Sequence, residues 1–377
     1  MTKDHKEFLP STVQEILLKA ALCRGADAIR HWHEWRNHFN IDRMDAGTMR
    51  LLPLLYQNLR EQGIDDPMLN VLKRFHRSSW YRNKLLLRAA AEPMAALKEA
   101  GIPTLVLKGA ALIARYYAGS ALRPMDDVDL FVPAQHARKA IEIIRRRGWT
   151  PKGPLPNNCL FQAYLTIKHG YAFTNASGQI IDLHWHVMDE CVDRSVDEDF
   201  LRHAVRIKID AVETKALNPA DQLLHICVHG ARWNPEPPLR WAADIMTILN
   251  REDVRIDWDR LCRKAGELRL MLPLKDALEY LKRRLDAPIP TNVLKNLRMI
   301  PVECRDRYHY LIITGSPDKL GPFWRIKRQS ARYQRVVSQS GRLKKLFLFF
   351  EFLVLGLYEF SGGILWPRLR GAKNPIP

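Results

Sequence analysis

Two aspartates, Asp127 and Asp129, stand two positions apart inside the apolar segment 125–132, MDDVDLFV. Side chains on a β-strand alternate between its two faces, so both carboxylates would point the same way while Val128 and Leu130 point into a core. Two carboxylates on one face repel each other unless a cation neutralises them. The spacing therefore predicts a metal site of the kind that supports phosphoryl or nucleotidyl transfer.

A third carboxylate is predicted on a neighbouring strand. The segment 179–187, QIIDLHWHV, alternates polar and apolar residues as a half-buried strand does, and its polar face carries Asp182, His184 and His186. The turn-forming residues 175–178, NASG, join it to a preceding apolar run, which predicts an antiparallel hairpin. Asp182 could complete a metal site and take a proton from an attacking hydroxyl, whereas His184 could touch substrate or simply bond that carboxylate.

Lys108 and Gly109 follow a short apolar segment, 104–107, that reads as the strand before a helix. Glycine in such a turn lets the backbone approach a phosphate. Lys108 and Arg123 flank the glycine turn and the aspartate strand, so each could hold phosphate charge or the departing pyrophosphate. The alternative for either cation is an ordinary ion pair with an aspartate of the 126–129 cluster.

The order of these motifs resembles the uncharacterised nucleotidyltransferase family of the DNA-polymerase-beta-like superfamily. In that superfamily a glycine motif follows the first strand, an Asp-hydrophobic-Asp-hydrophobic strand comes next, and a third acidic residue lies on a later strand. The corresponding positions in this chain are Gly109, Asp127, Asp129 and Asp182. The resemblance spans roughly residues 10 to 250, and the chain departs from the usual pattern at Ala110, where the superfamily has glycine or serine.

The resemblance implies an enzyme that transfers a nucleotide from a nucleoside triphosphate such as ATP to an acceptor hydroxyl and releases pyrophosphate. The implied cofactor is Mg²⁺ or Mn²⁺, with two ions bound by residues that are also catalytic: Asp127, Asp129 and Asp182. The implied nucleotide- and phosphate-binding residues are Lys108, Gly109, Arg123, His184 and Arg240. RNA, a protein and a peptide are all compatible acceptors. Two other functions stay open: a non-catalytic nucleotide- or metal-binding protein, and a glycosyltransferase of the Asp-x-Asp type.

Three regions would position these motifs. Apolar residues recur at helical spacing in residues 1–100, the predicted strands fall in residues 101–212, and helical spacing returns in residues 213–377. The predicted fold is α+β: a small mixed β-sheet nucleotidyltransferase core flanked by N-terminal and C-terminal helical regions.

The third region holds two histidines, His225 and His229, four positions apart on one helical face. A zinc pair is one interpretation, but the glutamate of a His-Glu-x-x-His motif is absent and a core position is favoured. A third option, implied by the resemblance, is that this helix and the segment from Arg240 to Asp244 wall the active-site cleft. Arg240 and Asp244 could also form a simple surface ion pair.

The chain carries 59 Lys and Arg against 41 Asp and Glu, a formal net charge of +18. Such an excess attracts polyanions, which include RNA, anionic lipid and the triphosphate itself. The six cysteines form no Cys-x-x-Cys pair, and the N-terminus lacks the apolar block of a signal peptide. Both features favour a reduced, cytoplasmic protein.

A strongly apolar segment, 346–358, lies near the C-terminus and is interrupted by Glu351. Its length falls short of the ~20 residues that a spanning helix needs. Lysines and arginines flank it on both sides, as they would in a helix that lies on an anionic membrane. A peripheral membrane contact is one interpretation, and a buried terminal helix or an oligomer contact is favoured over it.

Overall fold

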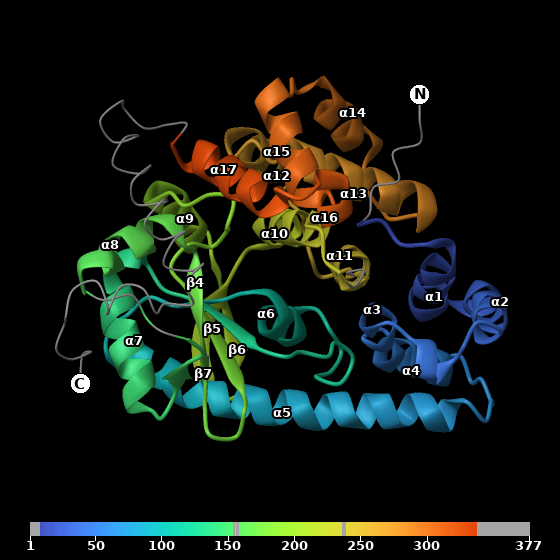
Figure 1. Ribbon diagram of the computed structural model, residues 1–377. Coiled ribbons are helices and arrows are strands. Elements are labelled where there is room, and N and C mark those ends of the chain that lie inside the picture. The colour runs from blue at the N-terminus through green and yellow to red at the C-terminus, as the bar shows by residue number, and fades with distance from the viewer. Residues whose placement is uncertain (1–7, 154, 156–157, 236–238, 338–377) are drawn as a thin grey trace.

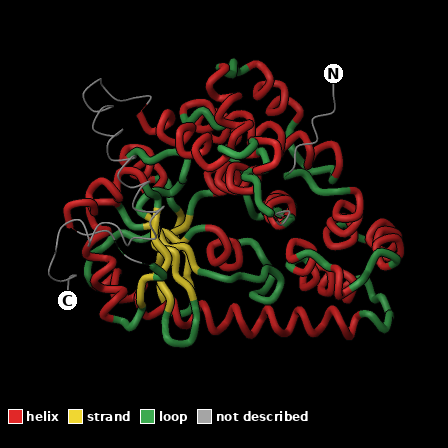
Figure 2. Tube along the Cα trace, viewed as in Figure 1, coloured by secondary structure: helices red, strands yellow, loops and turns green. Residues whose placement is uncertain are grey.

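A seven-stranded mixed sheet lies within the part of the chain that the computed structural model describes, residues 8–153, 155, 158–235 and 239–337. Its strand order is β3-β4-β5-β2-β1-β7-β6. Figures 1 and 2 show the strands gathered into one sheet with helices around it. The strands are β1 (Leu105–Val106), β2 (Val128–Phe131), β3 (Thr150–Pro151), β4 (Gly170–Thr174), β5 (Ile180–His184), β6 (Val205–Ile209) and β7 (Val212–Ala216).

The central ladder joins β2 and β5 in parallel, and it aligns Asp129 with Asp182. The hairpin of β4 and β5 is antiparallel, as the turn residues 175–178 predict. On the other side of β2, β1 pairs with it antiparallel and pairs with β7 in parallel. Two carboxylates more than fifty residues apart in sequence thus meet across one pair of strands.

Apolar residues on one face of this ladder form a core beneath it. Val128, Leu130, Ile181 and Leu183 are fully buried in a cluster that also contains residues of the helices α5 (Leu69–Glu99) and α7 (Ala137–Arg146). Because strand side chains alternate, Asp129 and Asp182 point to the opposite face. The predicted α+β fold is confirmed, with helices on both sides of the sheet (Figure 1).

Helices precede the sheet in sequence. They are α1 (Thr12–Leu22), α2 (Gly25–Arg36), α3 (Ala46–Met49), α4 (Leu52–Glu61) and α5, with a short 3₁₀ turn, η1 (Ile41–Arg43), between α2 and α3. Ser11 begins α1 with a capping box that it shares with Gln14. The long helix α5 runs along one margin of the molecule, beneath the sheet and the N-terminal helices (Figure 1).

Four helices and one 3₁₀ turn lie between the strands in sequence. They are α6 (Lys108–Arg115), η2 (Ala134–His136), α7, α8 (Asn158–Ile167) and α9 (Arg194–Arg202). The remaining helices follow β7: α10 (Pro219–Ala231), α11 (Arg240–Leu249), α12 (Trp258–Glu267), α13 (Met271–Arg284), α14 (Thr291–Met299), α15 (Cys304–Thr314), α16 (Pro317–Leu320) and α17 (Trp324–Val337).

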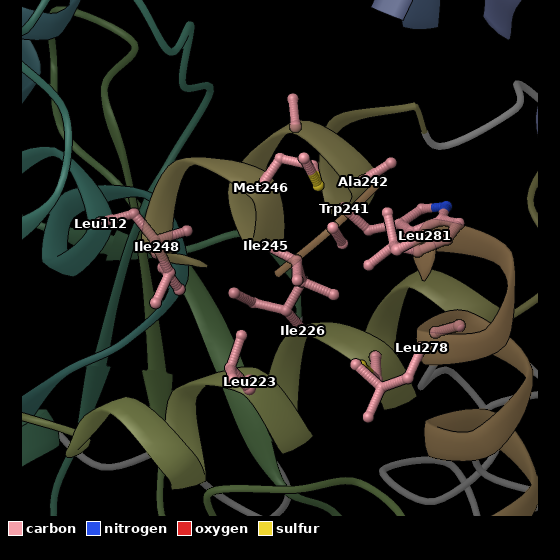
Figure 3. Packing of buried hydrophobic residues seen from close by; sticks show 14 of the residues in the cluster. Leu112, Leu223, Ile226, Trp241, Ala242, Ile245, Met246, Ile248, Leu278 and Leu281 are labelled. Carbon is pink, nitrogen blue, oxygen red and sulfur yellow. The ribbon is translucent and has the colours of Figure 1, made fainter. Parts of the chain in front are cut away.

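A second apolar cluster fixes α6 against the C-terminal helices. Figure 3 shows Leu112 of α6 beside Ile248 of α11, with Ile226 of α10 and Leu278 of α13 in the same cluster. All of these side chains are nearly or completely buried. This packing holds α10 and α11 over the face of the sheet from which Asp129 and Asp182 project.

No helix in the described part of the chain is long and apolar enough to cross a membrane. The apolar segment 346–358 lies outside the described residues, so its contact with a membrane stays a prediction.

Candidate active site

The carboxylates of Asp129 and Asp182 lie together with the imidazole of His184. One ligand atom from each of these residues falls within 4.8 Å of the others, which makes them a candidate metal site in the described part of the chain. His184 Nε2 lies 3.0 Å from Asp129 Oδ1 and 3.2 Å from Asp182 Oδ2. Carboxylate oxygens are the ligands that Mg²⁺ and Mn²⁺ prefer, so two members of this set suit a hard divalent cation.

Asp127 lies directly before β2 and is half-buried. Among the described residues its carboxylate makes no hydrogen bond and no ion pair, although Asp129 and Asp182 are close enough to repel it. Burial and these two carboxylates raise the pKa of Asp127 to about 6. A bound cation would favour its charged form.

Lys108 neutralises part of this negative charge. Its ammonium donates to Asp129 Oδ1 at 2.6 Å. Burial alone would raise the pKa of Asp129, but the charge of Lys108 and the bond from His184 outweigh it and hold that pKa well below its ordinary value. Lys108 adopts a φ of +45°, the left-handed region that a side chain seldom adopts, and such strain is frequent at functional sites.

Gly109 contributes close packing rather than a left-handed turn. It lies in the first turn of α6, and the positive φ that a glycine turn suggests belongs to Lys108 instead. A Cβ on Gly109 would come within 2.6 Å of Arg123 Nη1 and 2.7 Å of Met125 Sδ. Glycine thus allows α6 to approach the loop that leads to β2.

Arg123 forms a buried ion pair with Asp244 of α11. Its Nε and Nη2 donate to the two carboxylate oxygens at 2.7 and 2.9 Å, and the Tyr117 hydroxyl donates to the same carboxylate at 2.7 Å. The alternative in which Arg123 pairs with an aspartate of the 126–129 cluster is therefore wrong. The surface pair considered for Arg240 with Asp244 is also wrong, because Asp244 is buried and bonded to Arg123 and Tyr117.

Arg240 and Arg50 bring further positive charge to the cleft, and Arg50 also pairs with the exposed Asp126. Arg240 donates to the Pro124 carbonyl at 2.8 Å, and it has no carboxylate partner among the described residues. Burial, and then the nearby Arg123 and Arg50, lower the pKa of Arg240 to about 10. Both arginines line one cleft with Asp127 and Lys108.

His225 and His229 of α10 line the same cleft. Their rings stack with centroids 6.3 Å apart. Burial, and then the charge of Lys108, lower the pKa of His225 to about 3 and that of His229 well below its ordinary value. The metal-ligand cluster found in the described part of the chain contains neither ring, so the structure places both as neutral walls of the cleft.

The sequence motifs do not predict the places of Asn83 and Arg50 at the site. Asn83 is buried on α5, where its amide donates to the carbonyls of Ser120 and Arg123 and accepts from the Met125 amide. Leu86 and Ala90 follow Asn83 at the spacing of one buried helical face. A polar residue on such a face indicates that its side chain bonds a neighbouring segment. Arg50 carried no local signal, because its place in the cleft depends on packing between distant segments.

Comparison with known proteins identifies the family. Residues 46–286 match the family described as an uncharacterised nucleotidyltransferase. No curated protein matches the chain. The antibiotic-resistance factor ANT(2'')-Ia, whose solution structure is known, is 13% identical with a TM-score of 0.32, over 54% of this chain and 95% of that one.

A nucleotidyltransferase-like antigenic protein from Paracoccidioides brasiliensis is also 13% identical with a TM-score of 0.32, over 59% of this chain and 97% of that one. Neither structural similarity is close enough to add weight to the family match. That match covers more than half of the chain and includes the β2 and β5 aspartates. The protein belongs to the uncharacterised nucleotidyltransferase family.

Proposed function

We propose that this protein is a metal-dependent nucleotidyltransferase that moves a nucleoside monophosphate from a nucleoside triphosphate to an acceptor hydroxyl. The observation that carries the proposal is that Asp129 and Asp182 lie together on neighbouring strands, with Asp127 directly before β2 and close enough for their charges to repel it. Lys108 and Arg240 line one cleft with Asp127 and Asp129 and bring positive charge to it, although Lys108 is paired with Asp129. A metal-bound triphosphate would complement these charges. Its metal ions would meet the carboxylates, and its anionic phosphate oxygens would meet Lys108 and Arg240.

The chemistry of the donor set fits Mg²⁺ or Mn²⁺. Asp127, Asp129 and Asp182 would hold two ions, with the His184 imidazole in reach of the same position. The raised pKa of Asp127, and its lack of a partner among the described residues, are what an acidic site built around a cation should display. When bound, the ions would neutralise the phosphates and make the α-phosphorus more electrophilic.

The remaining residues have roles in the transfer itself. Asp182 would accept the proton of the acceptor hydroxyl, whose oxygen forms a bond to the α-phosphorus while the bond between that phosphorus and the bridging oxygen breaks. The electron pair leaves with pyrophosphate. Arg240 and Arg50 would hold the departing charge, and the N-terminus of α6 at Gly109 would present backbone amides to a phosphate.

We also place the protein in the cytoplasm. Cys23, Cys191, Cys227, Cys262 and Cys304 are all free, which is compatible with a reducing compartment.

The transferred group distinguishes this function from its competitors. With label in the α-phosphate of the triphosphate, nucleotidyl transfer predicts that label enters the acceptor; with label in the γ-phosphate, it predicts that label appears only in pyrophosphate. Consumption of a nucleotide-sugar would instead indicate a glycosyltransferase. Metal-dependent nucleotide binding with no transfer from any of the four triphosphates would indicate a binding protein.

A further inference from the structure

One long stretch of α5 is basic and free of acidic residues. Between residues 67 and 91 the chain has no Asp or Glu and six Lys or Arg: Lys73, Arg74, Arg77, Arg82, Lys84 and Arg88. All six side chains are exposed. The stretch therefore presents positive charge with no acidic residue of its own to neutralise it.

Two aromatic side chains stand among these cations. Trp80 is 50% exposed and Tyr81 is 60% exposed. Each lies three or four positions from both Arg77 and Lys84, so on a helix these four side chains are neighbours on one face. The outer face of α5 is defined by seven residues: Lys73, Arg74, Arg77, Trp80, Tyr81, Lys84 and Arg88.

The charge on the outer face is not neutralised within the described chain. None of its five Lys and Arg residues forms an ion pair with a described residue. Lys73 with Arg77, and Lys84 with Arg88, are like charges four positions apart, an arrangement that destabilises a helix. Binding of an anion along the helix would remove that repulsion.

The same helix reaches the candidate active site with its other side. Arg82 lies 3.5 Å from Asp126, the residue directly before Asp127. Its neighbour Asn83 holds the loop that leads into β2. A long ligand on the outer face could therefore continue around α5, past Arg82, toward the cleft.

We infer that the outer face of α5 binds single-stranded nucleic acid. Its cations would contact backbone phosphates, and Trp80 and Tyr81 would stack on unpaired bases. A paired duplex is disfavoured because stacking on side chains needs exposed base faces. An anionic membrane is disfavoured because the apolar side of α5 is buried in the core, which leaves little apolar area for insertion.

This inference deepens the proposed function by naming a polynucleotide as the acceptor class. In that respect alone it rests on the proposed function. Binding itself requires neither metal nor catalysis. The two proposals can therefore fail separately.

The test is fluorescence anisotropy of labelled 20-nucleotide RNA and DNA oligomers in metal-free buffer, titrated with the full chain at several salt concentrations. The double variant Trp80→Ala/Tyr81→Ala should weaken binding by about tenfold or more while leaving the salt dependence unchanged. Arg77→Gln/Lys84→Gln should weaken binding and reduce the slope of log K against log salt by about 1.4.

Matched controls lie elsewhere on the molecule. Arg145→Gln/Arg146→Gln removes two exposed charges from α7, and Tyr308→Ala/Phe323→Ala removes two exposed aromatic rings. Both controls should bind like the unaltered chain, and circular dichroism should show all four variants folded. RNA and DNA arms tell which polymer is preferred. The inference would be overturned if the chain bound no oligomer, if the controls lost as much affinity as the α5 variants, or if the chain bound only vesicles of anionic lipid. Asp127→Asn should bind the oligomers like the unaltered chain, because binding needs no metal.

Discussion

At the scale of single residues, Asp127 has the least favourable environment in the cleft. Its carboxylate lies beside two others, with no direct partner in the described chain, whereas Asp129 is bonded to Lys108 and His184. Strand alternation needs only local sequence, so it predicts the face on which Asp129 and Asp182 lie, whereas Asp127 lies directly before β2. The ion pair of Arg123 with Asp244 was not predictable, since its partners are 121 positions apart and meet only through packing.

Asp127→Asn should make the metal-free protein more stable near neutral pH while it removes function. The folded-state pKa of about 6 exceeds the ordinary 3.8, so the folded chain binds more protons between these values. Stability contributed by the protonated carboxyl is present below about pH 4 and is lost as pH rises through 6. In urea denaturation, the variant should gain about 1 to 2 kcal/mol at pH 7.5, and the gain should vanish at pH 4. A difference in unfolding free energy between the two proteins that does not change from pH 4 to pH 7.5 would show that the charge of Asp127 is not unfavourable in the folded chain.

The buried pair of Arg123 with Asp244 should dominate local stability. Asp244→Ala leaves a buried guanidinium without its carboxylate, and the expected loss is about 3 to 5 kcal/mol in urea denaturation. Arg251 with Asp253 is an exposed pair of similar geometry, so Asp253→Ala should cost far less in the same experiment. Equal losses would show that burial does not distinguish the pairs.

At the scale of elements, the approach of α6 and α5 to the loop 120–125 sets the shape of the cleft. Polar–apolar alternation was enough to predict β2 and β5 and the face on which their carboxylates lie. The sequence did not indicate that Lys108, rather than Gly109, takes the left-handed backbone, because a Lys-Gly turn offers glycine as the ordinary candidate. The sequence also does not show how closely α6 approaches the loop 120–125.

Gly109→Ala should disturb that approach. Its Cβ would require Arg123 and Met125 to move, and the expected cost is about 1 to 3 kcal/mol with weaker nucleotide binding. Gly266→Ala on α12 meets no atom within 4 Å, so it should be neutral or stabilising by up to about 1 kcal/mol. Thermal denaturation and nucleotide titration of both variants make the comparison, and a neutral Gly109→Ala would disprove the packing role.

Asn83→Ala should loosen the loop from α5. It leaves two carbonyls and one amide of the loop without their bonds, at an expected cost of about 2 to 4 kcal/mol. Ser79 lies one turn earlier on the same buried face, and its hydroxyl has no partner among the described residues. Ser79→Ala should therefore be nearly neutral in the same denaturation experiment. A loss confined to Ser79→Ala, or shared equally, would show that Asn83 does not anchor the loop.

At the scale of the whole molecule, the α+β fold and the family were both predicted from sequence and are confirmed. The prediction succeeded because the family motifs lie in order along the chain. What could not be predicted is which surfaces become exposed. Trp80 and Tyr81 occur in a helix whose other aromatic, Phe75, is more buried, and composition alone does not separate these environments.

The arrangement of segments also explains why the cleft needs most of the chain. Asp129 comes from β2, Arg50 from the end of α3, Arg240 and Asp244 from α11, and the two histidines from α10. The cluster in Figure 3 holds α10 and α11 against α6. Function should therefore depend on the C-terminal helices although no predicted metal ligand lies in them.

Pyrophosphate release is the most direct test of the proposed transferase. The full chain would be given each of the four nucleoside triphosphates with Mg²⁺ or Mn²⁺, and with total RNA or protein as acceptor. We expect metal-dependent release that falls at least about 100-fold in Asp127→Asn and Asp129→Asn. Asp126→Asn, which removes an exposed neighbouring carboxylate, should retain it. Release that persists in both site variants, or none with any triphosphate and acceptor, would contradict the assignment of these carboxylates to nucleotidyl transfer.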